Sequence, residues 1–135
     1  KKRVAIAGVI AMEPQVLILD EPTAGLDPQG VRDLIGVINT LAGEYGITVI
    51  FSTHDVSLVP EVADYLYVMH RGTIVSQGTV ETVFSDPDLL ASVRLDVPVI
   101  PKLIRSLQEE GIDIGMAYTL DEAKGAFLAS CRKRV

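Results

Sequence analysis

The first half of the chain alternates short apolar runs with apolar residues at helical spacing. Residues 16–19 and 48–52 are near-continuous apolar runs, typical of parallel strands that are covered on both faces. Between them, Asp27 and Pro28 have the chemistry of a helix N-cap and first turn. The apolar side of that predicted helix consists of Leu34, Ile35, Val37, Ile38 and Leu41. Strand, helix and strand in this order predict a right-handed βαβ unit with a parallel sheet.

Other elements follow from the same patterns. A helix is expected over about the first 12 residues, with Val4, Ala7, Ile10 and Ala11 on one face. Two runs that flank His70-Arg71-Gly72 predict a β-hairpin. Further helix starts are expected at Thr79, at Asp86-Pro87 and near Pro98, with Leu103, Ile104 and Leu107 at core spacing. Thr119 and Glu122 form the pattern of a capping box before a last helix.

Two adjacent carboxylates follow the first predicted strand directly. Asp20 and Glu21 come after residues 16–19, and ligands of open α/β sheets gather outside the carboxyl ends of the strands. Neighbouring residues of a strand point in opposite directions, so the two acids are expected to have different tasks. One can hold a metal while the other faces a water. Taken alone, however, an acid pair after an apolar run is usually only the polar end of a strand.

The wider segment VLILDEPTAGLDP resembles the Walker B strand and D-loop of the ATP-binding cassette (ABC) ATPases. Downstream, residues 52–55 (STHD) follow the second strand and resemble the switch histidine segment, or H-loop, of the same family. Two motifs in the expected order and spacing are much more specific than either one alone. The resemblance implies an α/β fold of the P-loop NTPase type.

The resemblance also implies roles for individual residues and the cofactors ATP and Mg²⁺. Asp20 would hold Mg²⁺, through water, and Glu21 would orient the attacking water. His54 would contact the γ-phosphate. The D-loop residues that would lie near the nucleotide or a second subunit are Gly25, Leu26 and Asp27. Without that context, Asp27 is an ordinary N-cap and His54 a strand-end histidine.

No G-x-x-x-x-G-K-[ST] phosphate loop occurs in these 135 residues. In the family, that loop and the signature motif lie upstream of the Walker B strand, and Lys1-Lys2-Arg3 with the apolar residues after it resembles the helix that follows the signature. The chain is therefore interpreted as the C-terminal part of a P-loop NTPase core, with parallel strands, a β-hairpin and a small C-terminal α/β extension. Residues 1–85 are assigned to the ATPase half and residues 86–135 to the extension, and the chain alone is expected to be inactive.

The amino-acid sequences of three segments resemble those of the ATPase subunits of energy-coupling factor importers, especially the cobalt and nickel type. These segments are TAGLDPQG, STHDVSLVPEVAD and RLDVPVIPKL. The resemblance implies a peripheral protein on the cytoplasmic face of the cell membrane. Its implied partners are a second ATPase subunit, identical or not, and the transmembrane subunits of the importer.

Composition argues against a membrane span, a signal peptide, a disulfide and a metal site of histidine and cysteine. The chain is 48% hydrophobic and 22% charged, without an apolar run near the ~18 residues of a membrane helix. Its start imitates a signal peptide, but Met12-Glu13-Pro14 is not a cleavage site of small residues. One cysteine, Cys131, excludes an internal disulfide, and with two histidines it makes no convincing metal site.

A net charge of −6 argues against a nucleic-acid surface, so no nucleic-acid partner is expected. Two alternative functions stay open. One is a non-transport ABC ATPase that acts on nucleic acid or ribosomes, and the other is an inactive interaction fragment.

Overall fold

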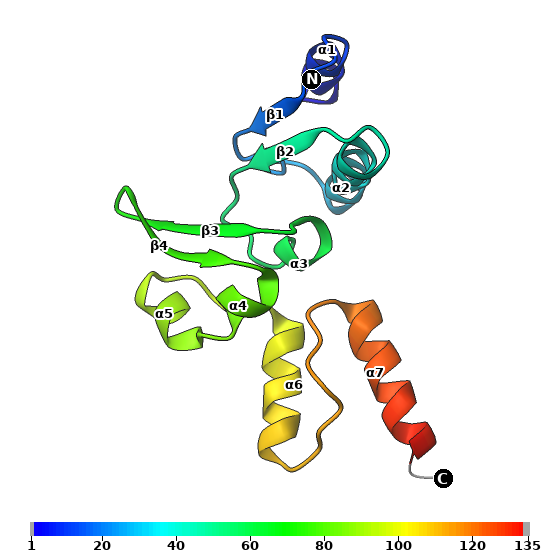
Figure 1. Ribbon diagram of the computed structural model, residues 1–135, viewed down its shortest axis with the longest axis vertical. Helices are drawn as coiled ribbons and strands as arrows, with labels where there is room; N and C mark the ends of the chain where they lie inside the picture. The colour runs from blue at the N-terminus through cyan, green and yellow to red at the C-terminus, as the bar shows by residue number, and fades with distance from the viewer. Residues whose placement is uncertain (1, 134–135) are drawn as a thin grey trace. The chain divides into compact units, whose positions relative to one another are not determined.

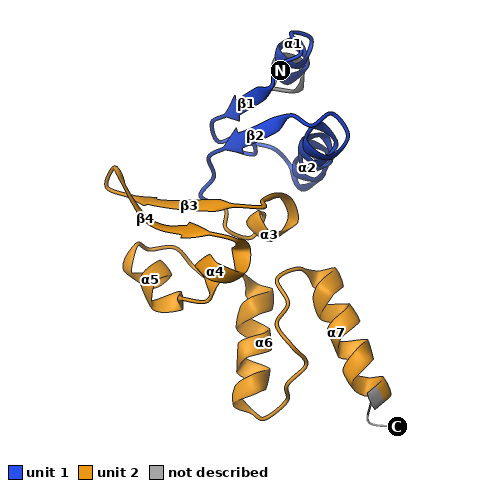
Figure 2. Cartoon of the chain, viewed as in Figure 1, with its two compact units in different colours: residues 1–54 blue, residues 55–135 orange. Residues whose placement is uncertain are grey.

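The structure of the chain is a computed structural model that describes residues 2–133. It divides into two compact units, residues 1–54 and residues 55–135 (Figure 2). Each unit has its own secondary structure.

The first unit contains the predicted βαβ arrangement (Figure 1). Helix α1 (Lys2–Ile10) precedes strand β1 (Val16–Leu19), helix α2 (Pro28–Gly43) and strand β2 (Thr48–Phe51). The two strands pair in parallel, from Val16 beside Thr48 to Leu19 beside Phe51. The predicted strand–helix–strand unit is therefore confirmed, including its parallel sheet.

Helix α2 begins as its sequence predicts. The carboxylate of Asp27 accepts a hydrogen bond from the Gly30 amide at 2.9 Å, and Pro28 occupies the first turn, where its missing N–H costs nothing. A Cβ at Gly30 would lie 2.7 Å from Asp27 Oδ1, so a larger residue there would displace the capping carboxylate. The buried residues of this unit's core are Leu17, Leu34, Ile35, Ile38 and Leu41.

The prediction that Val37 belongs to this core is wrong. Val37 is exposed, because at 100° per residue it lies at the border of the arc that the other four helix residues occupy. Burial of a Leu or Ile side chain contributes about 1.5–3 kcal/mol, so the four buried residues, not Val37, hold α2 in place.

The two strands are covered on one face only within the described residues. Leu17 is buried, whereas Val16, Ile18 and Ile50 are exposed on the opposite face, which we call the open sheet face. The expectation of strands covered on both faces is therefore not met by the described part of the chain. The physical reason is that its single βαβ unit offers one packed helix, α2, whose contacts go to β2.

We expect the 135-residue chain to self-associate through this open sheet face or the adjoining strand edges, since exposed apolar strands are templates for pairing. Light scattering over a concentration series should show a mean mass that rises with concentration. Ile18→Lys should return the mass toward the monomer, because Ile18 is 73% exposed at the centre of the face. Val99→Lys, at a residue of the second unit with similar exposure (76%), is the matched control and should leave association unchanged. A chain that stays monomeric at every concentration would contradict this expectation.

The second unit begins with a short helix and the predicted hairpin. Helix α3 (Val59–Val62) precedes the antiparallel strands β3 (Leu66–His70) and β4 (Thr73–Gly78). Arg71 and Gly72 both have positive φ (49° and 79°), which matches a two-residue hairpin turn of type I′. The hairpin prediction is thus confirmed, with one irregularity in register between Val68 and Met69.

Among the described residues, four more helices follow in the second unit, as can be followed in Figure 1. They are α4 (Val80–Phe84), α5 (Pro87–Ser92), α6 (Val99–Glu109) and α7 (Leu120–Lys133). The predicted capping box of α7 is present: the Glu122 amide donates to Thr119 Oγ1 at 3.3 Å, and Glu122 Oε2 accepts from the Thr119 amide at 3.2 Å. Ile104 of α6 is buried as predicted and Leu107 is half-buried, but Leu103 is exposed because α6 buries only one side.

One apolar core joins the hairpin to α4 and α5. It consists of Val59, Val68, Val80, Val83, Phe84, Leu90 and Val97. The expected boundary between residues 85 and 86 falls inside this core, and the compact units separate after His54 instead. The division into an ATPase half and an extension therefore stays a prediction.

The secondary structure of the expected extension differs in one respect from the prediction. Between residue 86 and residue 133 the structure describes helices and loops, so the extension is α rather than α/β there. In the segment between α6 and α7, Gly111 and Gly115 have φ of +80° and +82°, which are not strand conformations.

Candidate functional site

The predicted site lies where β1 and β2 end, in the first unit. Asp20 and Glu21 follow β1, and Ser52 and His54 follow β2. Since Leu19 pairs with Phe51, the parallel register brings the next residue of each strand, Asp20 and Ser52, side by side. The structure therefore brings together three predicted site residues, Asp20, Glu21 and His54, from segments more than 30 positions apart.

Ser52 makes three hydrogen bonds at this edge. Its amide donates to the Leu19 carbonyl at 3.0 Å, which extends the strand pairing by one step. Its hydroxyl donates to Asp20 Oδ1 at 2.5 Å and accepts from the Glu21 amide at 2.9 Å. The hydroxyl thus bridges the carboxylate of one acid and the backbone of the next.

Glu21 and His54 contact each other directly. Glu21 Oε1 lies 2.9 Å from His54 Nδ1, with the Glu21 side chain 37% exposed and the imidazole 81% exposed. An ionised carboxylate only accepts hydrogen bonds, so with Glu21 in that form the donor of this contact is the tautomer of His54 that carries a proton on Nδ1. Nε2 of a neutral His54 is then an acceptor, and it becomes a donor when the ring is protonated.

The other three predicted residues lie further along the loop after β1. Gly25 has a φ of +73°, a conformation that favours glycine, and Leu26 is half-buried with its amide bonded to the Thr23 carbonyl at 3.1 Å. Asp27 caps α2, so its ordinary structural role is present in the structure. The contacts described for this trio are with the loop and with α2, and their predicted role near the nucleotide stays a prediction.

The donor set at the strand ends fits Mg²⁺. Mg²⁺ prefers oxygen ligands and is usually held by one or two carboxylates, waters and substrate phosphates rather than by an all-protein cage. Asp20 offers an exposed carboxylate whose direction Ser52 holds. Among the described residues, no cluster of three or more His, Cys, Asp or Glu side chains could ligate a metal.

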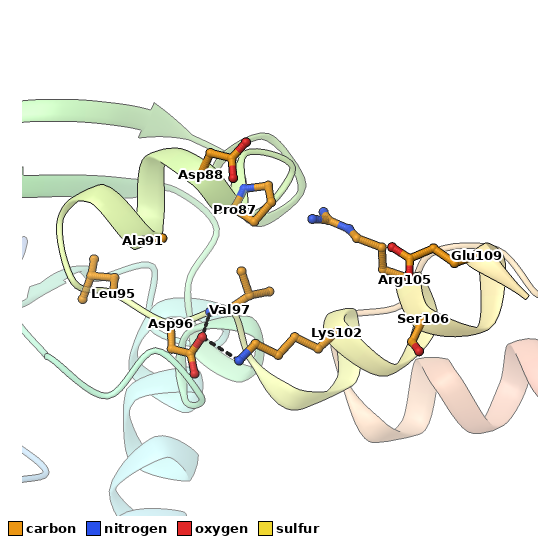
Figure 3. A pocket seen from close by; sticks show the side chains of 10 residues that line it. All are labelled: Pro87, Asp88, Ala91, Leu95, Asp96, Val97, Lys102, Arg105, Ser106 and Glu109. Carbon is orange, nitrogen blue, oxygen red and sulfur yellow. Dashed lines mark hydrogen bonds and ion pairs between the residues drawn. The ribbon is translucent and has the colours of Figure 1, made fainter.

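A hollow of about 350 Å³ lies in the second unit, between α5 and α6 (Figure 3). Lys102 Nζ lies 2.6 Å from Asp96 Oδ1 at its rim, and this hydrogen bond holds the pKa of Asp96 below its ordinary value. Arg105 donates to the Phe84 carbonyl at 3.3 Å. None of the predicted site residues lines this hollow, and its ion pair of Lys102 and Asp96 is exposed, so the pair contributes little free energy.

Ser52 is the site residue whose role sequence reasoning missed. In the motif, Ser52 is only the first residue of the STHD segment. A signal was nevertheless present, since aligning the two predicted strands in parallel places Asp20 opposite Ser52. That signal requires the register of the two strands to be known to within one residue. Apolar runs of this length do not define the register so closely.

In the part of the chain that the structure describes, no helix has the length and apolar character needed to cross a membrane.

Comparisons with known proteins agree with the motifs. Residues 2–59 match the family model described as "AAA domain, putative AbiEii toxin, Type IV TA system". The energy-coupling factor transporter ATP-binding protein EcfA of Methanoculleus marisnigri is 64% identical over 134 residues, which is 99% of this chain and 48% of that protein. The corresponding protein EcfA2 of Clostridium perfringens is 47% identical over 98% of this chain and 47% of its own length.

A solved structure is also similar. It is cbiO1 from Clostridium perfringens, described as part of the ABC transporter complex cbiONQ, with a TM-score of 0.58 and 43% identity. The similarity covers 78% of this chain and 41% of the cbiO1 chain. This chain thus spans about half the length of the relatives it matches, or somewhat less. Over nearly all of its own length, the chain belongs to the ABC transporter ATPases and is related to the ATP-binding proteins of energy-coupling factor importers.

Proposed function

We propose that this chain is part of the ATP-hydrolysing subunit that energises a membrane importer. The observation that carries the proposal is the convergence of Asp20, Glu21 and His54 at the carboxyl ends of two parallel strands. Phosphoryl transfer needs little covalent chemistry from the protein, so catalysis there is mainly positioning and charge stabilisation. Two carboxylates and an imidazole on a rigid sheet edge are suited to that task.

Each residue has a distinct role in this proposal. Asp20 holds Mg²⁺, through water, and Glu21 accepts a hydrogen bond from the attacking water and orients it. When bound, Mg²⁺ offsets the negative charge of the phosphates. The loop residues Gly25 and Asp27, which are exposed, and Leu26, which is half-buried, face the nucleotide or a second ATPase subunit.

The contact between Glu21 and His54 gives the histidine a defined task. With Nδ1–H directed at Glu21, His54 presents Nε2 outward, and protonation makes Nε2 a donor to a phosphate oxygen. The same contact restricts the rotation of the Glu21 carboxylate. In this proposal His54 therefore both contacts the γ-phosphate and aligns Glu21.

The partners and the cargo are proposed from the resemblance of this chain to importer ATPases. Two ATPase subunits, identical or different, close around nucleotide, and transmembrane subunits convert that closure into transport. The protein is peripheral, on the cytoplasmic face of the membrane, and the cargo is cobalt or nickel ions, which do not touch this subunit. Two observations support this part of the proposal. The sequences of residues 23–30 and 52–64 resemble those of the importer subfamily, and the similar proteins are named as ATP-binding proteins of energy-coupling factor transporters.

Transport by the complete subunit in proteoliposomes with its membrane partners tests this function. We expect MgATP to drive uptake of radioactive cobalt or nickel. We expect Glu21→Gln to abolish this uptake, because two ATPase subunits that close around ATP without hydrolysing it cannot reopen for another cycle. ATP hydrolysis with uptake of neither ion would show that the cargo is wrong. A complete subunit that does not hydrolyse ATP would refute the function itself.

A further inference from the structure

We propose that Ser52 is a positioning residue of the carboxylate site, whose hydroxyl sets the directions of Asp20 and Glu21 together. The inference rests on the proposed ATPase function for its catalytic consequence. Its structural part depends only on the hydrogen bonds of this chain.

The backbone of Glu21 has an uncommon conformation. Its φ is +43°, in the left-handed region that residues other than glycine rarely adopt. Pro22 follows, and a residue before proline prefers an extended backbone. Such a conformation persists only where the surrounding structure holds it. The bond from the Glu21 amide to Ser52 Oγ, at 2.9 Å, is a direct means of holding it.

The Ser52 hydroxyl makes two hydrogen bonds at once. A serine hydroxyl has one proton to donate, and here that proton goes to Asp20 Oδ1 at 2.5 Å. A lone pair of the same oxygen accepts the Glu21 amide. One atom thus couples the carboxylate of the first acid to the backbone of the second.

The backbone of Ser52 is held by the parallel sheet. The Ser52 amide donates to the Leu19 carbonyl at 3.0 Å, so the serine backbone continues the parallel pairing of β1 and β2. Its hydroxyl is therefore placed by the sheet rather than by a loose loop. Residues that hold a metal-binding side chain in this way typically change affinity or activity by about 10–100-fold when they are replaced.

The test uses three variants of the complete subunit. Ser52→Ala removes both hydroxyl bonds, and Ser52→Thr keeps the hydroxyl, with its extra methyl group at an exposed position. Ser92→Ala is the matched control, since the Ser92 hydroxyl donates to the Leu89 carbonyl at 2.6 Å within its own helix. The measurements are kcat, the Mg²⁺ concentration for half-maximal activity, and hydrogen exchange of the Glu21 amide by NMR.

We expect Ser52→Ala to lower kcat about 10-fold or more, to raise the half-maximal Mg²⁺ concentration and to speed exchange at Glu21. Ser52→Thr should restore most of all three values, and Ser92→Ala should leave them unchanged. The proposal is overturned if the Glu21 amide of the Ser52→Ala subunit exchanges its hydrogen as slowly as that of the unsubstituted subunit. It is equally overturned if Ser52→Ala only lowers the melting temperature, with kcat and Mg²⁺ dependence unchanged.

The amide exchange separates this inference from the proposed function. If the unsubstituted subunit has no ATPase activity, the function is refuted, while faster exchange in Ser52→Ala still supports the positioning role and unchanged exchange still refutes it. If Glu21→Gln abolishes hydrolysis but Ser52→Ala does not reduce it, the function stands and the positioning role fails.

Discussion

Glu21→Gln in the complete subunit is expected to slow ATP hydrolysis by about 10²–10⁴-fold, the usual scale for loss of a general base. Glutamine keeps the size of the side chain and loses the negative charge that orients water. Binding of ATP and Mg²⁺ should persist, because Asp20 and its bond to Ser52 are untouched. The measurement is single-turnover hydrolysis, with size-exclusion chromatography to detect the ATP-bound pair of subunits that should accumulate.

Two further substitutions separate the roles of the neighbouring groups. Asp20→Asn should weaken Mg²⁺ binding rather than trap the ATP-bound pair. His54→Ala should slow turnover through loss of the phosphate contact and of the 2.9 Å contact with Glu21, while the circular dichroism spectrum stays unchanged. A Glu21→Gln subunit that turns over at the normal rate would place the base elsewhere.

The 135-residue chain alone is expected to bind MgATP more weakly than about 1 mM, if at all, and not to hydrolyse it. The sequence contains no G-x-x-x-x-G-K-[ST] segment, whose amides and lysine cradle the phosphates in P-loop enzymes. The site that the structure describes offers two carboxylates and one imidazole, and carboxylates repel phosphate oxygens. The net charge of −6 adds to that repulsion.

Isothermal titration calorimetry of the chain with MgATP makes this measurement, and the complete subunit under the same conditions is the control. Micromolar binding by the 135-residue chain would contradict the proposed division of the nucleotide site. In that case Asp20→Asn would show whether the carboxylate site is responsible for the binding.

Much of the local structure was determined by the sequence itself. The helical spacing from Leu34 to Leu41, the N-cap at Asp27 and the capping box of Thr119 and Glu122 all predicted elements that the structure contains. These features depend on residues within about four positions of one another, so the sequence displays them directly. The order and spacing of the Walker B and H-loop motifs likewise predicted the family that the comparisons show.

Burial at the borders of helices was only partly predictable. Val37 and Leu103 have the spacing of core residues but are exposed, because the number of packing partners, not the period alone, decides which border residues are covered. The expected boundary between residues 85 and 86 followed from a change in the character of the sequence. Residues on both sides of it pack into one core, and that packing is not visible in the sequence.

By itself, the sequence determined that Asp20 and Glu21 end a strand and that His54 follows another, because each statement concerns a short stretch of chain. Only the tertiary structure decided that Ser52 bridges the two acids and that Glu21 contacts His54, 33 residues away. These contacts depend on the register of two parallel strands, and a slip of one residue would turn every side chain to the other face. The register results from the packing of β1, β2 and α2 as a whole, so no single segment of the sequence contains it.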